Sequence, residues 1–448
     1  MTKILATIGE VSSDIKSLKK IYKHTNFFRL NLSHNKLKWH SKVSKIIKKN
    51  FKNSIILVDL PGVKPRTCNE LNIKILKNQI IRFYFKKKKF GDDIFSIGVS
   101  NIIPKAKKKY FTVSDGKNKF KFIKQTSNEI IGISEDSFIL FPRQGLNIPF
   151  SSYDNKLQEQ TYFNTLKKLH QIKFDAVGLS FIQDNKIINK IKKLYPKINL
   201  ISKIENYLGI KNLIDIVKSS DGIMIDRGDL QAELGELNLF DNVRKIISVS
   251  HKFGKPLIMA TENLGGMMLG TMPTKNDLIS IGYSIQMNVD TIMLSEETAV
   301  NKNFFKIIKT LSDILQKEKK KRTSKKSELN DSIIWESLAK LQYCKIVLFT
   351  KKGFAIDKIR TINPDLDLFI FTDNKKIFNQ SKIRKYCKSV LIPKFNNKNL
   401  EMFTYKYIKK YSKSIFSKTE NSVLLRVSFP TGGMRANTLT ILNKKSFS

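Results

Sequence analysis

The sequence predicts an α/β protein built on a (β/α)8 TIM barrel, with an inserted small β-barrel lid domain and a C-terminal α/β domain. Two observations predict the barrel: eight short apolar runs each end in polar residues, and eight segments with helical periodicity alternate with them. In this fold the strand ends converge on one rim, which carries the active site. The polar ends of the runs cover residues 6–9, 29–34, 57–59, 177–180, 202–206, 225–229, 259–262 and 293–296.

The helical segments place apolar residues on one side. Between residues 38 and 50, for example, Val43, Ile46 and Ile47 share one face and lysines occupy the other. Strand and helix therefore alternate as the barrel requires. The predicted helices cover residues 13–24, 38–50, 157–170, 185–194, 208–219, 239–253, 277–286 and 304–317.

One connection is too long for a simple barrel. The third strand ends near Asp59 and the fourth begins near Asp175, whereas such connections normally take a handful of residues. Short alternating runs, separated by Gly, Asn and Asp, fill the interval. We predict that residues 1–62 and 151–325 form the barrel, and that residues 63–150 form a small β-barrel that closes over the rim as a lid.

A stretch rich in Lys, Ser and Thr, residues 317–326, separates the barrel from a further unit. A helical segment and four β-rich runs follow it, which predicts an α/β domain over residues 328–448. These segments cover residues 333–341, 345–350, 368–372, 389–392 and 422–427.

The chain is strongly basic, with a formal net charge of +44. Such a charge would suggest a polyanionic partner. However, Lys, Asn, Ile and Phe are abundant together and share A/T-rich codons, and arginine is scarce. The arginine enrichment and the interleaved aromatic residues that are typical of nucleic-acid readers are missing. We therefore interpret the lysines as solvated surface residues and expect no nucleic-acid partner.

The cysteines and the apolar runs bear on the cellular compartment. Cys68, Cys344 and Cys387 are isolated, which argues against a disulfide framework and predicts a reducing environment. No run is long and uncharged enough to cross a membrane, and the first strand leaves no room for a signal peptide. We expect a cytoplasmic enzyme without a membrane partner.

A lysine and two carboxylates end neighbouring strands. Lys203 and Glu205 lie two residues apart on one strand and therefore point the same way, and Asp229 follows the next strand. Two carboxylates beside a lysine suit Mg²⁺ with positions left open for phosphate oxygens. This pattern favours phosphoryl transfer, with Arg29 and Arg66 as further cations for phosphate.

Other interpretations of these residues stay open. Lys203 and Glu205 could form a structural ion pair, and Lys203 could be a Schiff-base lysine, although neighbouring acids keep an amine charged whereas that chemistry needs a lowered pKa. Thr261 could relay a proton or simply be a satisfied hydroxyl. The oxygens of Asn31, Ser33 and Asp59 could hold a monovalent cation or bond one another, and chemistry alone favours the second.

Motifs along nearly the whole chain resemble pyruvate kinase, and the chain is identified as a divergent member of that family. The motifs lie at residues 2–9, 29–34, 201–206, 220–224, 227–230, 254–261 and 293–295 with 297–298, at 113–116 and 145–149 in the lid, and at 431–432 with 437–438 near the C-terminus. The resemblance implies Mg²⁺-dependent phosphoryl transfer from phosphoenolpyruvate to ADP, giving pyruvate and ATP in glycolysis, by a homotetramer.

The resemblance also implies a role for each matching residue. Catalytic roles fall on Lys203, Thr261 and Arg29, and substrate binding on Gly228, Asp229, Thr261 and Arg29. Nucleotide binding falls on Arg66, Asn31 and His34, Mg²⁺ binding on Glu205 and Asp229, and a monovalent cation site on Asn31, Ser33, Asp59 and Leu60.

Several residues depart from the family pattern. Lys64 replaces the usual glutamate, as in members that dispense with K⁺, because a fixed ammonium can replace the charge of the ion. We therefore expect K⁺ to be dispensable. Gln144 replaces a lysine of the lid. Four acids are added near the site, and they should weaken anion binding unless Mg²⁺ or lysines compensate: Glu10, Asp226, Glu262 and Glu296.

Two alternatives accompany this hypothesis. One is a metal-dependent barrel lyase that acts on a 2-oxo acid through an enolate and needs no ADP. The other is a catalytically weakened or inactive protein of this family that serves as a binding or scaffold protein.

Overall fold

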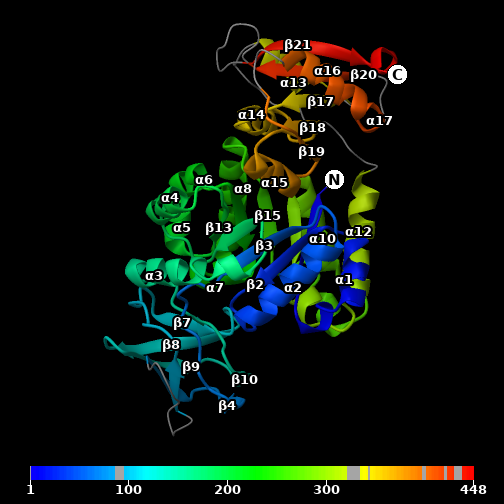
Figure 1. The fold of residues 1–448 in the computed structure, drawn as a ribbon. Coiled ribbons are helices and arrows are strands. Elements are labelled where there is room, and N and C mark those ends of the chain that lie inside the picture. The colour runs from blue at the N-terminus through cyan, green and yellow to red at the C-terminus, as the bar shows by residue number, and fades with distance from the viewer. Residues whose placement is uncertain are drawn as a thin grey trace.

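The computed structural model describes residues 2–85, 95–319, 333–341, 344–395, 400–417, 421–427 and 436–447. Figure 1 shows three units in a row, with the barrel between the inserted β unit and the C-terminal unit. The predicted boundary at residues 325–328 and the motif at residues 431–432 lie outside the described residues.

Eight parallel strands form a closed barrel in the order β1-β16-β15-β14-β13-β12-β3-β2. This confirms the predicted (β/α)8 barrel. The strands are β1 (Lys3–Thr7), β2 (Phe27–Asn31), β3 (Ile55–Leu60), β12 (Ala176–Leu179), β13 (Asn199–Ile204), β14 (Gly222–Asp226), β15 (Leu257–Ala260) and β16 (Thr291–Leu294).

The long helices lie where periodicity predicts them, with two differences. The predicted helix at residues 157–170 ends at Leu166, and the one at residues 208–219 is broken at Asn212. The helices are α1 (Ile15–Tyr22), α2 (Leu37–Asn50), α3 (Asn155–Leu166), α4 (Asn185–Leu194), α5 (Tyr207–Lys211), α6 (Leu213–Ser219), α8 (Leu239–Lys252), α10 (Lys275–Gln286) and α12 (Phe304–Lys319). Three short helices on the rim are additional: α7 (Arg227–Leu234), α9 (Gly266–Leu269) and α11 (Glu296–Ala299).

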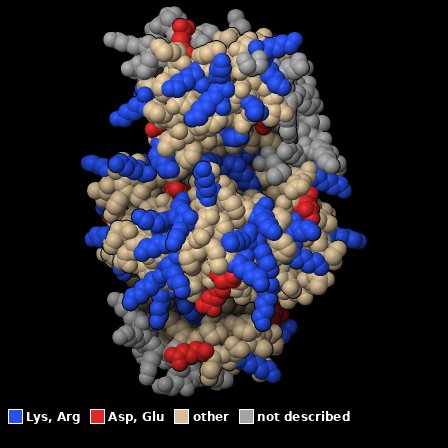
Figure 2. Space-filling view, turned by 45° about the vertical axis from the view of Figure 1, so that its right-hand side comes forward, with Lys and Arg blue, Asp and Glu red and all other residues tan. Residues whose placement is uncertain are grey.

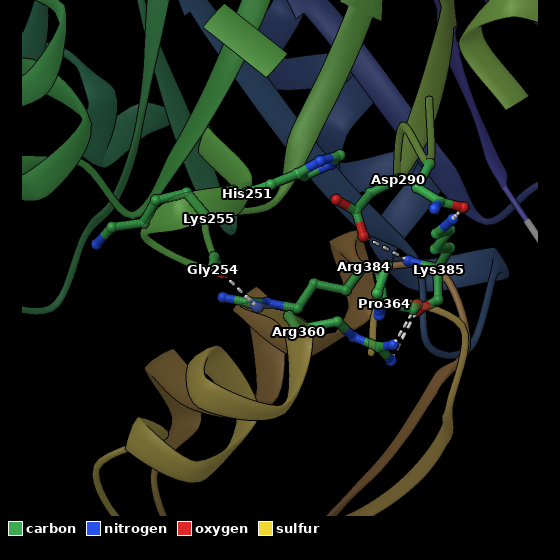
Figure 3. Close-up of a pocket in the computed structure, with 9 residues that line it drawn as sticks. His251, Gly254, Lys255, Asp290, Arg360, Pro364, Arg384 and Lys385 are labelled. Carbon is green, nitrogen blue, oxygen red and sulfur yellow. Dashed lines mark hydrogen bonds between the residues drawn. The ribbon is translucent and has the colours of Figure 1, made fainter. Parts of the chain in front are cut away.

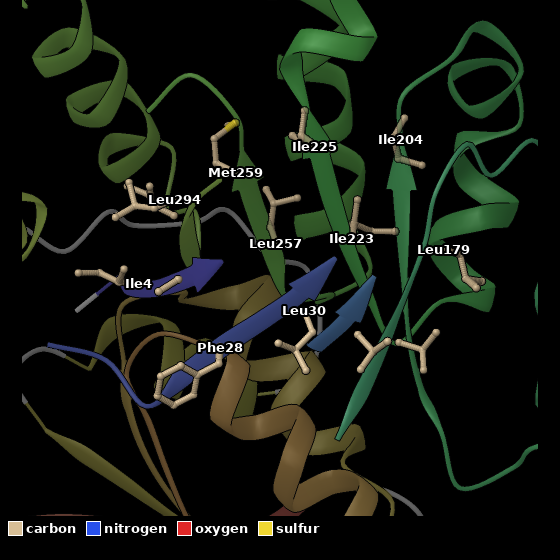
Figure 4. Packing of buried hydrophobic residues seen from close by; sticks show 14 of the residues in the cluster. Ile4, Phe28, Leu30, Leu179, Ile204, Ile223, Ile225, Leu257, Met259 and Leu294 are labelled. Carbon is tan, nitrogen blue, oxygen red and sulfur yellow. The ribbon is translucent and has the colours of Figure 1, made fainter. Parts of the chain in front are cut away.

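Strand residues alternate between two apolar clusters. Ile4, Phe28 and Leu30 pack outward under the helices, as Figure 4 shows, whereas Leu5 and Phe27 fill the barrel interior. This alternation follows from the two-residue period of a strand. The charged residues of the rim therefore stand on a packed and rigid base.

The inserted unit is a curled β-sheet with its own apolar core. Its six-stranded sheet has the order β11-β7-β8-β9-β5-β6, and β10 pairs with β4. Single bridges from Arg66 to Gly145 and from Thr67 to Val99 join the two sheet edges, so this small barrel closes without a continuous ladder. The strands are β4 (Ile73–Ile75), β5 (Ile80–Phe85), β6 (Ser96–Val99), β7 (Tyr110–Val113), β8 (Asn118–Gln125), β9 (Glu129–Ser134), β10 (Phe138–Leu140) and β11 (Leu146–Asn147).

The C-terminal unit is a five-stranded sheet in the order β19-β18-β17-β20-β21, with β21 antiparallel to β20. Its strands are β17 (Lys345–Phe349), β18 (Asp367–Thr372), β19 (Cys387–Leu391), β20 (Asn421–Val427) and β21 (Ala436–Asn443). Its helices are α13 (Ile333–Lys340), α14 (Phe354–Ile362), α15 (Lys375–Ile383), α16 (Leu400–Lys410) and α17 (Ser412–Ile415).

Helix α15 docks on the floor of the barrel, where the strands begin. Ile383 at its end is fully buried in the interior cluster of the barrel. Thr291 Oγ1 donates to the Ile383 carbonyl at 2.9 Å, and Arg384 Nη1 donates to the Gly254 carbonyl at 2.7 Å. Figure 3 shows the pocket at this junction, where the Lys385 backbone N–H also donates to Asp290.

The surface is basic over the whole face that Figure 2 shows, because lysines and arginines project from all three units. Among the residues that the structure describes, no helix combines the length and apolar character needed to cross a membrane.

Candidate active site

Lys203 lies at the centre of the rim and contacts three carboxylates. Its Nζ lies 2.8 Å from Glu205 Oε1, 3.3 Å from Asp59 Oδ2 and 3.3 Å from Asp226 Oδ2. These acids come from the ends of three strands, which are β3, β13 and β14, or from the residue just beyond. Burial alone would lower the pKa of Lys203, but the three carboxylates together raise it above its ordinary value. The amine is therefore held as an ammonium, which argues against a Schiff-base lysine.

Asp59 connects Lys203 to Arg29. The Nε and Nη2 of Arg29 both donate to Asp59 Oδ2, at 2.9 and 2.6 Å, and Arg29 Nη1 donates to Thr7 Oγ1 at 3.2 Å. Burial raises the pKa of Asp59, but Lys203 and Arg29 outweigh it and hold that pKa below its usual range. An ionised Asp59 therefore fixes two cations side by side in a nearly dry site.

Glu205, Asp226 and Asp229 form a cluster of carboxylates, with one oxygen from each lying within 4.8 Å of the others. Burial raises the pKa of Glu205 to about 8, and the charges of Asp226 and Asp229 add to this rise. Burial also raises the pKa of Asp229. Glu205 Oε1 is buried, and within the described part of the chain its polar partner is the Lys203 ammonium at 2.8 Å. These oxygens fit a hard divalent cation, which would relieve the repulsion between them.

Lys64 joins the lid to the rim. Its Nζ lies 2.7 Å from Asp115 Oδ1 in the lid and 2.5 Å from Asp229 Oδ1 on α7. Burial lowers the pKa of Lys64, but these two carboxylates outweigh it and raise that pKa above its ordinary value. Its ammonium is thus fixed against one of the predicted metal ligands.

Two oxygens of the predicted monovalent site have protein donors. Asp59 Oδ1 accepts from Ser180 Oγ at 3.2 Å, and Asn31 Oδ1 accepts from the Ser33 backbone N–H at 3.1 Å. Leu60 ends β3 beside Asp59.

Thr261 has an unusual backbone conformation. Its φ is +59°, and the next residue, Glu262, has a φ of +51°. A β-branched residue rarely adopts this left-handed region, and such outliers cluster at functional sites. Arg227 holds the turn, because its guanidinium donates to the Ala260 carbonyl at 3.3 Å and to the Thr261 carbonyl.

The Thr261 hydroxyl is fixed at both ends. It donates to the Ala260 carbonyl at 2.7 Å and accepts from the Gly228 backbone N–H at 3.1 Å. Gly228 is the second residue of α7 and precedes Asp229. The left-handed turn therefore holds this hydroxyl against the first turn of the helix that carries Asp229.

The three predicted nucleotide residues lie toward the seam between lid and barrel. The pKa of His34 is lowered first by burial and then by the charges of Arg66, Arg143 and Arg29. Arg143 donates to the Ser33 carbonyl at 3.3 Å, and Arg66 donates to the Arg143 carbonyl at 3.2 Å. Sequence reasoning missed Arg143, although it stands beside Gln144, where the family has a lysine. The two arginines make this seam attractive to phosphate.

The comparisons with known proteins agree with this geometry. The family model described as pyruvate kinase, barrel domain, matches residues 1–305. The chain belongs to the pyruvate kinase family. It is 28% identical to the pyruvate kinase of Thermotoga maritima, over 98% of this chain and 99% of that protein. It is also 28% identical to the pyruvate kinase of Methanocaldococcus jannaschii, over 70% of this chain and 68% of that one.

A solved structure has the same fold. The crystal structure of pyruvate kinase from Pyrobaculum aerophilum matches with a TM-score of 0.76 and 21% identity, over 99% of this chain and 98% of that one. The relatives therefore share the fold along its whole length, while most side chains differ.

The four added acids differ in where they lie. Glu10, Glu262 and Glu296 are exposed, whereas Asp226 is buried beside Lys203. Of these family departures, Asp226 is the one that enters the charged centre.

Proposed function

We propose that this chain transfers the phosphoryl group of phosphoenolpyruvate to ADP in a Mg²⁺-dependent reaction, giving pyruvate and ATP. One observation carries the proposal: the Lys203 ammonium lies within ion-pairing distance of Glu205 and Asp226, beside a cluster of carboxylates on the rim of the barrel. Such a centre suits a migrating phosphoryl group, because its equatorial oxygens need neutralising charge from several directions.

The residues would divide the work as follows. Lys203 and Arg29 would bind oxygens of the phosphoryl group, and both are already fixed by Asp59. Glu205 and Asp229 would hold Mg²⁺, which when bound supplies further positive charge to the phosphoryl oxygens. Positioning by fixed charges of this kind is the main source of catalysis in phosphoryl transfer.

The three-carbon acid would lie against α7 and the Thr261 turn. Gly228 and Asp229 lie in the first turn of this helix, and the Thr261 hydroxyl accepts from the Gly228 backbone N–H. We assign to Thr261 the transfer of a proton, through a water molecule, to the enolate. On the lid side, Arg66, Asn31 and His34 would bind ADP, with the arginine facing its phosphates.

The cellular setting is part of the proposal. We propose a cytoplasmic glycolytic enzyme that works as a homotetramer, as its family membership suggests. We also propose that K⁺ is dispensable, because the Lys64 ammonium is permanently held beside Asp229.

A weakened enzyme is the second candidate, and Asp226 favours it. Because Lys203 already faces three carboxylates, a phosphoryl group must compete with them for its charge. In the limiting case the chain has no activity and serves only as a binding or scaffold protein.

The test is ATP formation by the purified chain from phosphoenolpyruvate and ADP. We expect ATP and pyruvate in equal amounts, and no product after EDTA removes divalent cations. Pyruvate formed without ADP would favour the lyase instead. No turnover at saturating substrates would favour the inactive protein.

A further inference from the structure

Asp226 ends β14 and stands at the first position before α7. An aspartate at this position normally accepts hydrogen bonds from the first backbone N–H groups of the helix. Asp226 makes no such bond. Its side chain is 8% exposed, and it points instead toward Lys203, at 3.3 Å.

Lys203 alone does not account for this position. Its ammonium already has Glu205 at 2.8 Å and Asp59 at 3.3 Å. The Asp226 carboxylate shares this one ammonium with them, at 3.3 Å. Buried carboxylates are costly unless cations compensate their charge. One ammonium shared by three carboxylates compensates Asp226 only in part.

A divalent cation would balance the carboxylates of the rim better than the cations of the protein alone. The ion pairs at the rim join five carboxylates (Asp59, Asp115, Glu205, Asp226 and Asp229) to three cations (Arg29, Lys64 and Lys203). Carboxylates therefore outnumber the cations paired with them, although Arg227 and Arg66 also attract Asp226 and Asp115. Lys64 also occupies Asp229 Oδ1, which weakens Asp229 as a ligand, and Asp226 restores an anionic oxygen on the same side.

We propose that Asp226 is a third protein ligand of the divalent cation, beside Glu205 and Asp229. The inference rests on the proposed function for the identity of the cation site and deepens it. Three carboxylate oxygens select a hard cation such as Mg²⁺ or Mn²⁺. They also leave about three of six octahedral positions for substrate and water. The chain therefore binds the cation before any substrate is present.

The test is to measure Mn²⁺ binding to the full chain by electron paramagnetic resonance, in the absence of phosphoenolpyruvate and nucleotide. We expect Asp226→Asn and Asp226→Ala each to raise the Mn²⁺ dissociation constant by about tenfold or more, because carboxylate count sets the affinity of such sites. We use two variants so that the test survives if one of them misfolds. Circular dichroism checks that each variant is folded.

The matched control is Glu262→Gln. It removes one negative charge from the same rim, but Glu262 is exposed and lies outside the carboxylate cluster. We expect Glu262→Gln to change the Mn²⁺ dissociation constant by less than about twofold, because exposed charges are screened. That result would show that Asp226 acts as a ligand and not only through the overall negative charge of the rim. Equal losses in Glu262→Gln and Asp226→Asn would overturn the proposal.

A second background separates ligation from ion pairing with the lysine. In Lys203→Met the ammonium is gone, so an Asp226 that merely neutralised it has no further role. We expect Asp226→Asn to weaken Mn²⁺ binding in this background as well. Unchanged binding there would overturn the proposal.

The outcome does not depend on turnover. If the wild-type chain makes no ATP, but replacing Asp226 weakens Mn²⁺ binding, the proposed function fails and the assignment of Asp226 as a third ligand stands. If the wild-type chain makes ATP, but replacing Asp226 leaves Mn²⁺ binding unchanged, the proposed function stands and this inference fails.

Discussion

The two ends of the barrel are built on opposite principles. At the rim, charged side chains face one another, and the carboxylates of Glu205 and Asp226 share the Lys203 ammonium. At the floor, Ile383 fills the interior, and hydrogen bonds run to backbone carbonyls such as that of Gly254. Buried polar atoms without hydrogen bonds occur at the floor as well, such as His251 Nε2 and Arg360 Nε, but the cluster of carboxylates lies at the rim. This contrast assigns stability to the floor and chemistry to the rim.

The largest effect is expected at the rim, from Arg29→Met. The rate of ATP formation should fall by about 10²–10³-fold, as when one preorganised charge donor is lost. Unfolding should change much less, because Asp59 keeps Lys203 as a partner. Arg244→Met removes an exposed arginine of α8 and is the control. Comparable rates in the two variants would contradict the assignment.

The opposite result is expected at the floor, from Ile383→Ala. The free energy of unfolding in urea should fall by about 2–5 kcal/mol, because the change leaves a cavity inside the barrel. The rate of the folded enzyme should persist. Ile279→Ala, at a side chain that is 70% exposed, should cost about 0.5 kcal/mol or less. If Ile383→Ala lowered the rate of ATP formation without lowering the free energy of unfolding, the assignment of stability to the floor would be wrong.

Glu233 tests how pH acts on the seam between rim and lid. It is fully buried and accepts hydrogen bonds from Tyr153 Oη at 2.5 Å and Asn147 Nδ2 at 2.9 Å. Burial raises its pKa to about 7, from 4.5 in the unfolded chain. The folded state therefore holds more protons between these values, and stability falls as pH rises through that window.

The variant that isolates this group is Glu233→Gln. The contribution of Glu233 is on the order of 3 kcal/mol between pH 4.5 and 7. The difference in unfolding free energy between wild type and Glu233→Gln should shift across this window in favour of the amide. Parallel curves of the two proteins would show that Glu233 does not titrate there.

The smallest effect concerns the monovalent cation. Replacing K⁺ by Na⁺ or tetramethylammonium at equal ionic strength should change the rate by less than about twofold, since screening is unchanged and Lys64 is fixed in place. A large loss of rate would show that the oxygens of Asn31, Ser33 and Asp59 do bind K⁺.

Periodicity was enough to predict the barrel and its long helices, because each strand and helix buries a continuous apolar face. It missed α7, whose residues 227–234 include Gly228 and Asp229 and show no apolar stripe. That helix forms because tertiary contacts, such as the bond from Gly228 to Thr261, fix its first turn.

Contacts between residues far apart in the sequence could not be predicted either. Lys64 is predicted to replace the charge of a monovalent cation, but the sequence did not indicate its partners, Asp115 and Asp229, which lie 51 and 165 residues further along the chain. Likewise, nothing in the spacing of Ile383 indicates that it enters the barrel from another domain. Such pairings depend on three-dimensional docking, which local patterns do not encode.

The most direct test compares ATP formation by the wild-type chain, Lys203→Met and Lys186→Met, an exposed lysine of α4. We expect Lys203→Met to make no detectable ATP while its thermal unfolding remains cooperative, and we expect Lys186→Met to match the wild type. Full activity in a folded Lys203→Met protein would contradict the central role of that ammonium.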